Sequence, residues 1–238
     1  MTRENTRFES PVAAILLIHK ALRTEATHVE NMVNNLEIGD SLQPFNLAFY
    51  SWATALVYHA EQEDRFMMAY LNHNGPSDQD PPGLDRASIK RDGSLGTLAK
   101  DDASDLLSKV GWAMVAQEEK LHQQLLAKVE DVLTVLQQDI GQTSLIPRTI
   151  QHLYQGVVAL RISLEDHLET EEALVLPVIR RRMDEAQQAR LARSLLIDDG
   201  AQHTCWMLDW VRQRLTHVEQ EMLAELEERF GMTADQDH

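Results

Sequence analysis

The chain has 238 residues, of which 43% are hydrophobic and 25% are charged, a composition typical of a soluble globular protein with a buried core. Its formal net charge is −16, from 22 basic and 38 acidic residues, which argues against binding to nucleic acid or to an anionic membrane face. The single cysteine, Cys205, excludes an intrachain disulfide, and residues 1–11 lack the apolar core of a secretory signal. We therefore expect a cytoplasmic protein without a membrane-spanning segment.

Helical periodicity dominates the chain. The first predicted helix begins after Ser10-Pro11, with the serine as cap, and ends at Gly39. A second helix is predicted over residues 44–71. Residues 72–102, rich in Gly, Pro, Asp and Ser, then predict a long irregular connection.

The second half of the chain is also predicted to be helical. A third helix covers residues 103–139, a fourth covers residues 147–183, and a shorter segment spans residues 185–197. A final amphipathic helix is predicted over residues 201–230. Its apolar stripe would pack on the preceding helices or on a second subunit, so a homodimer through this helix is one expectation.

No segment has the alternating pattern of a β-strand, and the predicted fold class is all-α. We expect a four-helix bundle over residues 1–183, including the long loop 72–102, followed by a C-terminal helical extension over residues 184–230. Residues 231–238 form a polar tail.

An internal repeat points to the functional residues. The motif His-x-x-x-Glu occurs at residues 59–63 and again at residues 167–171, and each copy is followed directly by a second acidic residue. His19 and His122 occupy matching places on the preceding predicted helices. Each half of the bundle therefore supplies one histidine from its first helix and a His-x-x-x-Glu motif from its second.

Residues four apart share one face of a helix, so each motif directs an imidazole and a carboxylate to one point. Apolar neighbours place that face inward, and Phe66 and Leu174, seven residues after the motif histidines, are expected on it. A buried carboxylate such as Glu63 is costly unless cations balance its charge. Mixed nitrogen and oxygen ligands with open positions favour two non-haem iron ions, with manganese or zinc as alternatives.

This set of residues, one histidine per helix and two His-x-x-x-Glu motifs, resembles the haemerythrin and HHE cation-binding family over about residues 12–180. The resemblance implies an up-down four-helix bundle with a di-iron centre. By position it implies four terminal imidazole ligands and two bridging carboxylates, which are His19, His59, His122 and His167, and Glu63 and Glu171.

The third helix departs from the family's oxygen carriers, which have His-x-x-x-His there. The residue four before His122 is Glu118, so either Glu118 or Glu119 completes the ligand shell or one position is open to water. Both outcomes argue against reversible oxygen carriage. We expect a di-iron protein that binds or reacts with oxygen, peroxide or nitric oxide, as a sensor, scavenger or enzyme.

Three alternatives use the same sequence differently. A ferritin-like iron-handling register would use Glu-x-x-His at residues 25–28 and 119–122, but His28 is predicted to face away from the apolar stripe. The bundle could also store or report iron without turnover, or be a metal-free interaction protein. His203 and Cys205 are expected to be ordinary core residues.

Overall fold

The computed structural model describes residues 10–68, 98–138 and 146–229, with side chains described from residue 113 onward in the second range. These residues are mostly helical and contain no β-strand, which confirms the all-α prediction. No helix among them is long and apolar enough to cross a membrane. The elements are α1 (Ala13–Asn34), α2 (Gln43–Gln62), the π-helical turn η1 (Glu63–Met68), α4 (Leu98–Gln138), α5 (Pro147–Thr170), the π-helical turn η2 (Glu171–Val175), α6 (Leu176–Arg182), α7 (Glu185–Leu196), α8 (Trp206–Arg212) and α9 (His217–Arg229).

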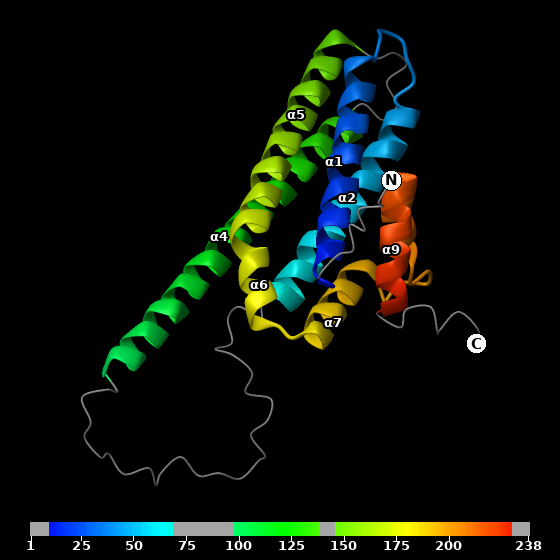
Figure 1. Cartoon of the computed structure of the whole chain (residues 1–238). Helices are drawn as coiled ribbons and strands as arrows, with labels where there is room; N and C mark the ends of the chain where they lie inside the picture. Colours follow the sequence, from blue (N-terminus) through cyan, green and yellow to red (C-terminus); the bar gives the residue numbers. More distant parts are fainter. Residues whose placement is uncertain (1–9, 69–97, 139–145, 230–238) are drawn as a thin grey trace, which may run out of the picture.

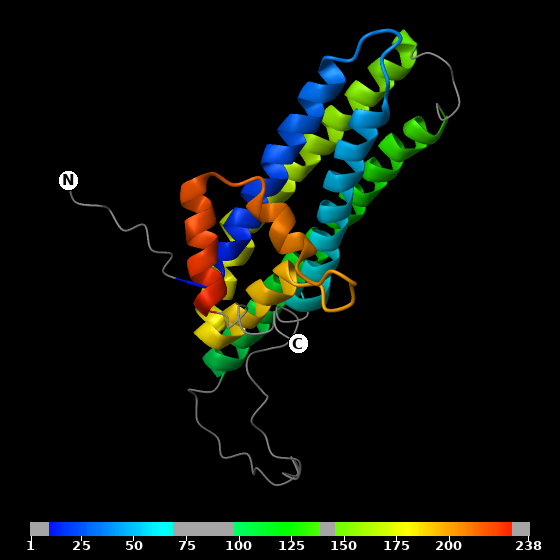
Figure 2. The same cartoon turned by 90° about the vertical axis from the view of Figure 1, so that its right-hand side faces the viewer.

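The four long helices lie side by side (Figures 1 and 2). Helix α1 contacts α2 and α5, and α4 contacts the same two helices from the other side. The residues that face each other across this arrangement are apolar and fully buried, for example Ile18, Leu56, Leu125 and Leu160. Each such side chain contributes about 1.5–3 kcal/mol when it leaves water, so the apolar stripes hold the helices together.

Several helix ends differ from the predicted ones. Helix α1 begins at Ala13, and the hydroxyl of Ser10, predicted to cap it, donates instead to the side chain of Gln188. The helix ends at Asn34, and Gly39 follows in a turn with a φ of 95°. Helix α4 begins at Leu98, five residues before its predicted start, so the last five residues of the predicted loop 72–102 are helical. The rest of that loop, residues 72–97, lies outside the described residues.

Both π-helical turns begin at the glutamate of a His-x-x-x-Glu motif. The prediction that Phe66 and Leu174 face inward is wrong, because their exposed fractions are 38% and 55%. A π turn contains more residues than an α turn, so the inward position moves one residue along the chain. Met67 and Val175 occupy it instead and are buried.

The predicted single C-terminal helix is also wrong, because α8 and α9 are separated by a turn at residues 213–216. The backbone N–H and the hydroxyl of Thr216 donate to the Glu219 carboxylate at 2.9 and 2.7 Å, which caps α9. Both helices pack on α1, and Trp210 and Leu215 of the apolar stripe are buried within the chain. A homodimer through this region remains a prediction.

Residues just before α8 do not lie in the core as expected. The His203 side chain is 69% exposed and pairs with Asp209 at 2.9 Å. Cys205 is only half-buried. Both predictions assumed that the helix starts at residue 201, whereas α8 begins at Trp206.

A buried ion pair fastens the C-terminal helices to the rest of the molecule. The Nε of Arg214 donates to the Glu25 carboxylate of α1 at 2.6 Å, and both side chains are largely buried. The guanidinium also lies 4.0 Å from the ring centroid of Trp210, whose indole N–H donates to Ser51 of α2. The α8–α9 segment is therefore attached to both α1 and α2.

Replacing Arg214 should destabilise the fold more than breaking an exposed pair between the same segments. Arg214→Met leaves Glu25 buried without its cation, and we expect a loss of about 3 kcal/mol in the free energy of unfolding. Lys20→Met removes the exposed Lys20–Glu219 pair between α1 and α9 and should cost less than about 1 kcal/mol. Urea unfolding measures the free energy of unfolding of both variants, and equal losses would show that the Arg214–Glu25 pair does not hold the C-terminal helices in place.

Candidate metal centre

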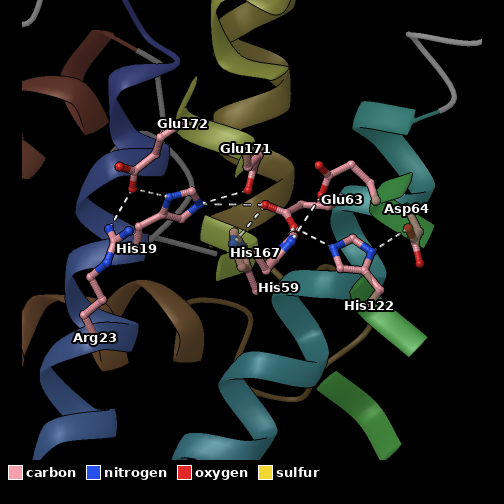
Figure 3. Close-up of polar contacts among 10 residues, drawn as sticks. His19, Arg23, His59, Glu63, Asp64, His122, His167, Glu171 and Glu172 are labelled. Atoms are coloured by element: carbon pink, nitrogen blue, oxygen red, sulfur yellow. Dashed lines mark hydrogen bonds and ion pairs between the residues drawn. The ribbon is translucent and has the colours of Figure 1, made fainter. Parts of the chain in front are cut away.

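The four histidines identified by the repeat converge in the interior. Each comes from a different long helix, α1, α2, α4 or α5, and no more than 1% of any of them is exposed. Figure 3 shows their rings around the Glu63 side chain. The rings form two close pairs, His19 with His59 at 5.3 Å between centroids and His122 with His167 at 4.6 Å.

The Glu63 carboxylate lies between these two pairs. Its Oε1 is 2.9 Å from the Nε2 of His59 and 4.0 Å from the Nε2 of His19. Its Oε2 is 3.2 Å from the Nε2 of His122 and 3.6 Å from the Nε2 of His167. Each oxygen therefore faces a different pair of imidazoles.

The potential ligand atoms form two groups, in each of which all atoms lie within 4.8 Å of one another. The first donor group consists of His19, His59, Glu63 and Glu171, and the second consists of Glu63, His122 and His167. Glu63 belongs to both groups. Glu171 belongs to the first alone, where its Oε2 is 3.2 Å from the Nε2 of His19.

Most of the atoms that point into this centre lack hydrogen bonds, the exception being the pair formed by the Nε2 of His122 and the Oε2 of Glu63. Within the described part of the chain, the buried atoms without a hydrogen-bond partner include the Nε2 atoms of His19, His59 and His167. They also include three carboxylate oxygens, which are Oε1 of Glu63 and both oxygens of Glu171. Buried polar atoms in proteins nearly always have partners. Converging imidazole and carboxylate lone pairs are the donors that metal cations take, so these residues fit a metal centre.

Carboxylates also contact the outer side of the imidazoles. Asp64 is 2.7 Å from the Nδ1 of His122, and Glu172 is 2.8 Å from the Nδ1 of His19. These contacts cross between the halves of the repeat, since each acidic residue follows the glutamate of one half and supports a histidine of the other. Such contacts fix the ring orientation and leave Nε2 facing the centre.

Glu118, predicted to complete the ligand shell, is buried but lies in neither donor group. Its Oε2 is 3.1 Å from the Nδ1 of His167, the nitrogen that faces away from Glu63. Glu119, the other predicted ligand on this helix, is exposed. Helix α4 therefore contributes His122 to the centre and Glu118 to the layer behind it.

Of the residues of the ferritin-like register, only His122 lies in the centre. His28 is exposed, as predicted, and Glu25 is paired with Arg214. Neither residue belongs to a donor group.

Carboxylates control the protonation of the centre in the metal-free protein. Burial favours neutral imidazole, but Asp64 and Glu63 outweigh it and raise the pKa of His122 to about 10. Burial also lowers the pKa of His167, but Glu118 and Glu63 outweigh it and raise this pKa to about 9. Burial and the Glu63 charge raise the pKa of Glu171 to about 7. Protons therefore balance the buried carboxylates where cations would otherwise do so.

Comparisons with protein-family models, curated proteins and solved structures gave no match to this chain.

Metal binding should release protons and strengthen as the pH rises. A metal ion needs neutral imidazole, whereas His122 and His167 are protonated at neutral pH in the metal-free protein. We expect the affinity for Zn²⁺ to increase between pH 6 and 8, on the order of tenfold per pH unit for each proton released. Titration in weakly buffered solution with a pH indicator measures the release. Asp64→Asn should release fewer protons, because Asp64 helps to keep His122 protonated. Binding of Zn²⁺ to the wild-type protein without any proton release would show that protons do not balance the buried carboxylates.

Proposed function

We propose that this chain is a haemerythrin-like four-helix bundle whose two donor groups hold a dinuclear non-haem iron centre that reacts with oxygen, peroxide or nitric oxide. The observation that carries the proposal is the position of Glu63, which presents one oxygen to each donor group. A carboxylate shared in this way can bridge two cations. The contacts of α1 with α2 and α5, and of α4 with the same two helices, support the bundle arrangement.

The donor set favours iron over other metals. The described residues of the two groups offer only imidazole nitrogen and carboxylate oxygen, a combination that suits non-haem iron, with manganese and zinc as alternatives. His19 and His59 would be terminal ligands of one ion, and His122 and His167 of the other. Bound iron would supply one-electron redox chemistry and affinity for small diatomic molecules and peroxide.

The surrounding residues set the properties of the centre. Asp64, Glu172 and Glu118 contact Nδ1 atoms, so they orient the imidazoles and increase their basicity. The direct ligands are shielded from bulk water, which strengthens electrostatic interactions within the centre. Anionic ligands and basic imidazoles both favour the ferric state. The arrangement therefore supports oxidation rather than reversible oxygen carriage.

A second candidate function is the storage or reporting of iron without turnover. The observation that favours it is the exposure of Asp64, whose side chain is 47% exposed while it contacts the buried His122. The second donor group is therefore close to solvent through this residue. Exposure of the reduced protein to oxygen, peroxide or nitric oxide, with product analysis over many equivalents, distinguishes the two functions.

The purified protein should bind about two iron ions per chain, one for each donor group. Glu63→Ala should lose both ions, because its carboxylate contributes to both groups. His28→Ala should retain both, since that residue is exposed on the same helix as His19. Metal analysis after anaerobic reconstitution, with circular dichroism to confirm folding, tests this. A folded wild-type protein without iron would refute the proposal.

The diferrous protein should oxidise on contact with oxygen and should not return to the diferrous state when the gas is removed. The reason is the anionic charge around the centre, including Glu118 behind His167. Glu118→Gln removes one charge without removing a proposed ligand, and we expect oxidation to slow by about tenfold while iron content is kept. Stopped-flow absorption follows the oxidation of the wild-type protein and of the variant. Full recovery of the diferrous spectrum under vacuum would indicate an oxygen carrier.

A further inference from the structure

The two donor groups come from a repeat, but they are not equivalent. The first offers two imidazoles and two carboxylates, whereas the second offers two imidazoles and only the shared Glu63. The difference is Glu171, whose Oε2 faces His19. Carboxylate charge attracts a divalent cation strongly in a buried site, so the first group should bind its ion more tightly.

The two donor groups also differ in how firmly the carboxylates that contact the outer side of their imidazoles are held. Behind His19, Glu172 accepts a hydrogen bond from Arg23 at 2.7 Å, and Arg23 also donates to Glu165 at 3.0 Å. This chain of alternating charges fixes Glu172 in place. Figure 3 shows Arg23 and Glu172 at the α1 end of the centre, next to His19.

The carboxylate on the outer side of His122, Asp64, is more exposed and, within the described ranges, has fewer partners. Asp64 lies at the opposite end of the centre in Figure 3, and its side chain is 47% exposed. Among the described residues its one ion-pair partner is His122. Among the residues whose side chains are described, Asp64 has no cation partner that corresponds to Arg23, so fewer contacts restrain Asp64 than restrain Glu172.

We propose that the two metal positions have different tasks: the first donor group retains its ion, and the second exchanges its ion with solution on the side of His122 and Asp64. This inference rests on the proposed dinuclear centre and deepens it. The chain then loads in two steps, and the occupancy of the second position follows the concentration of available ferrous iron. Glu63, the shared ligand, connects that occupancy to the retained ion.

Anaerobic titration with ferrous iron, in competition with a chromophoric ferrous chelator, tests the two positions. We expect two binding steps whose dissociation constants differ by at least about tenfold, and, on addition of excess chelator, a fast release of one ion followed by a slow release of the other. Two ions that bind and leave in a single phase would overturn the inference and leave the dinuclear centre intact. Fewer than two ions at saturation would instead refute the proposed function.

Matched variants of the outer carboxylates assign the steps. Asp64→Asn should weaken the second step by about 10-fold or more and leave the first unchanged. Glu172→Gln changes the equivalent residue of the other half of the repeat and should weaken the first step. The same result for both variants, or the reverse assignment, would overturn the inference. Thermal unfolding at one and at two equivalents of iron gives a second readout, with the larger increase in Tm expected from the first ion.

Discussion

The buried carboxylate of Glu63 is the constraint on which the rest of the centre depends. It is fully buried and surrounded by four imidazoles from four helices. A lone carboxylate in such a place would cost several kcal/mol or become protonated, so positive charge must accompany it. Protons on the imidazoles can supply that charge in the metal-free protein, and two cations can supply it more completely.

The fold positions this carboxylate through contacts that reach beyond the four long helices. Glu63 begins η1, and η1 contacts α7 as well as α2. Helices α8 and α9 cover α1, which carries His19, and the Glu25–Arg214 pair holds them there. The C-terminal extension therefore supports the elements that present Glu63 and His19, and it is part of the structure that shapes the centre.

The sequence was sufficient to predict the helices and the convergence of the main candidate ligands, because four-residue spacing and a repeat are local patterns. It did not predict the π turns, and so placed Phe66 and Leu174 inward. The repeat aligned Asp64 with Glu172 but did not indicate their contacts, which join different halves of the fold. The break before α9 had a local signal, since Thr216 and Glu219 have the spacing of a helix N-terminal capping pair. The position of Glu118 behind His167 depends on how α4 packs against α5, which spacing along one helix does not define.

The most direct test of the shared carboxylate is the distance between the two metals. X-ray absorption at the iron edge of the reconstituted protein should show an iron–iron scattering shell at about 3.5–4 Å, as in dinuclear sites held by bridging ligands. The shell should be absent from Glu63→Ala. A spectrum of the wild-type protein with two irons per chain and only light-atom shells would show that Glu63 does not join two metals, and would contradict the dinuclear centre.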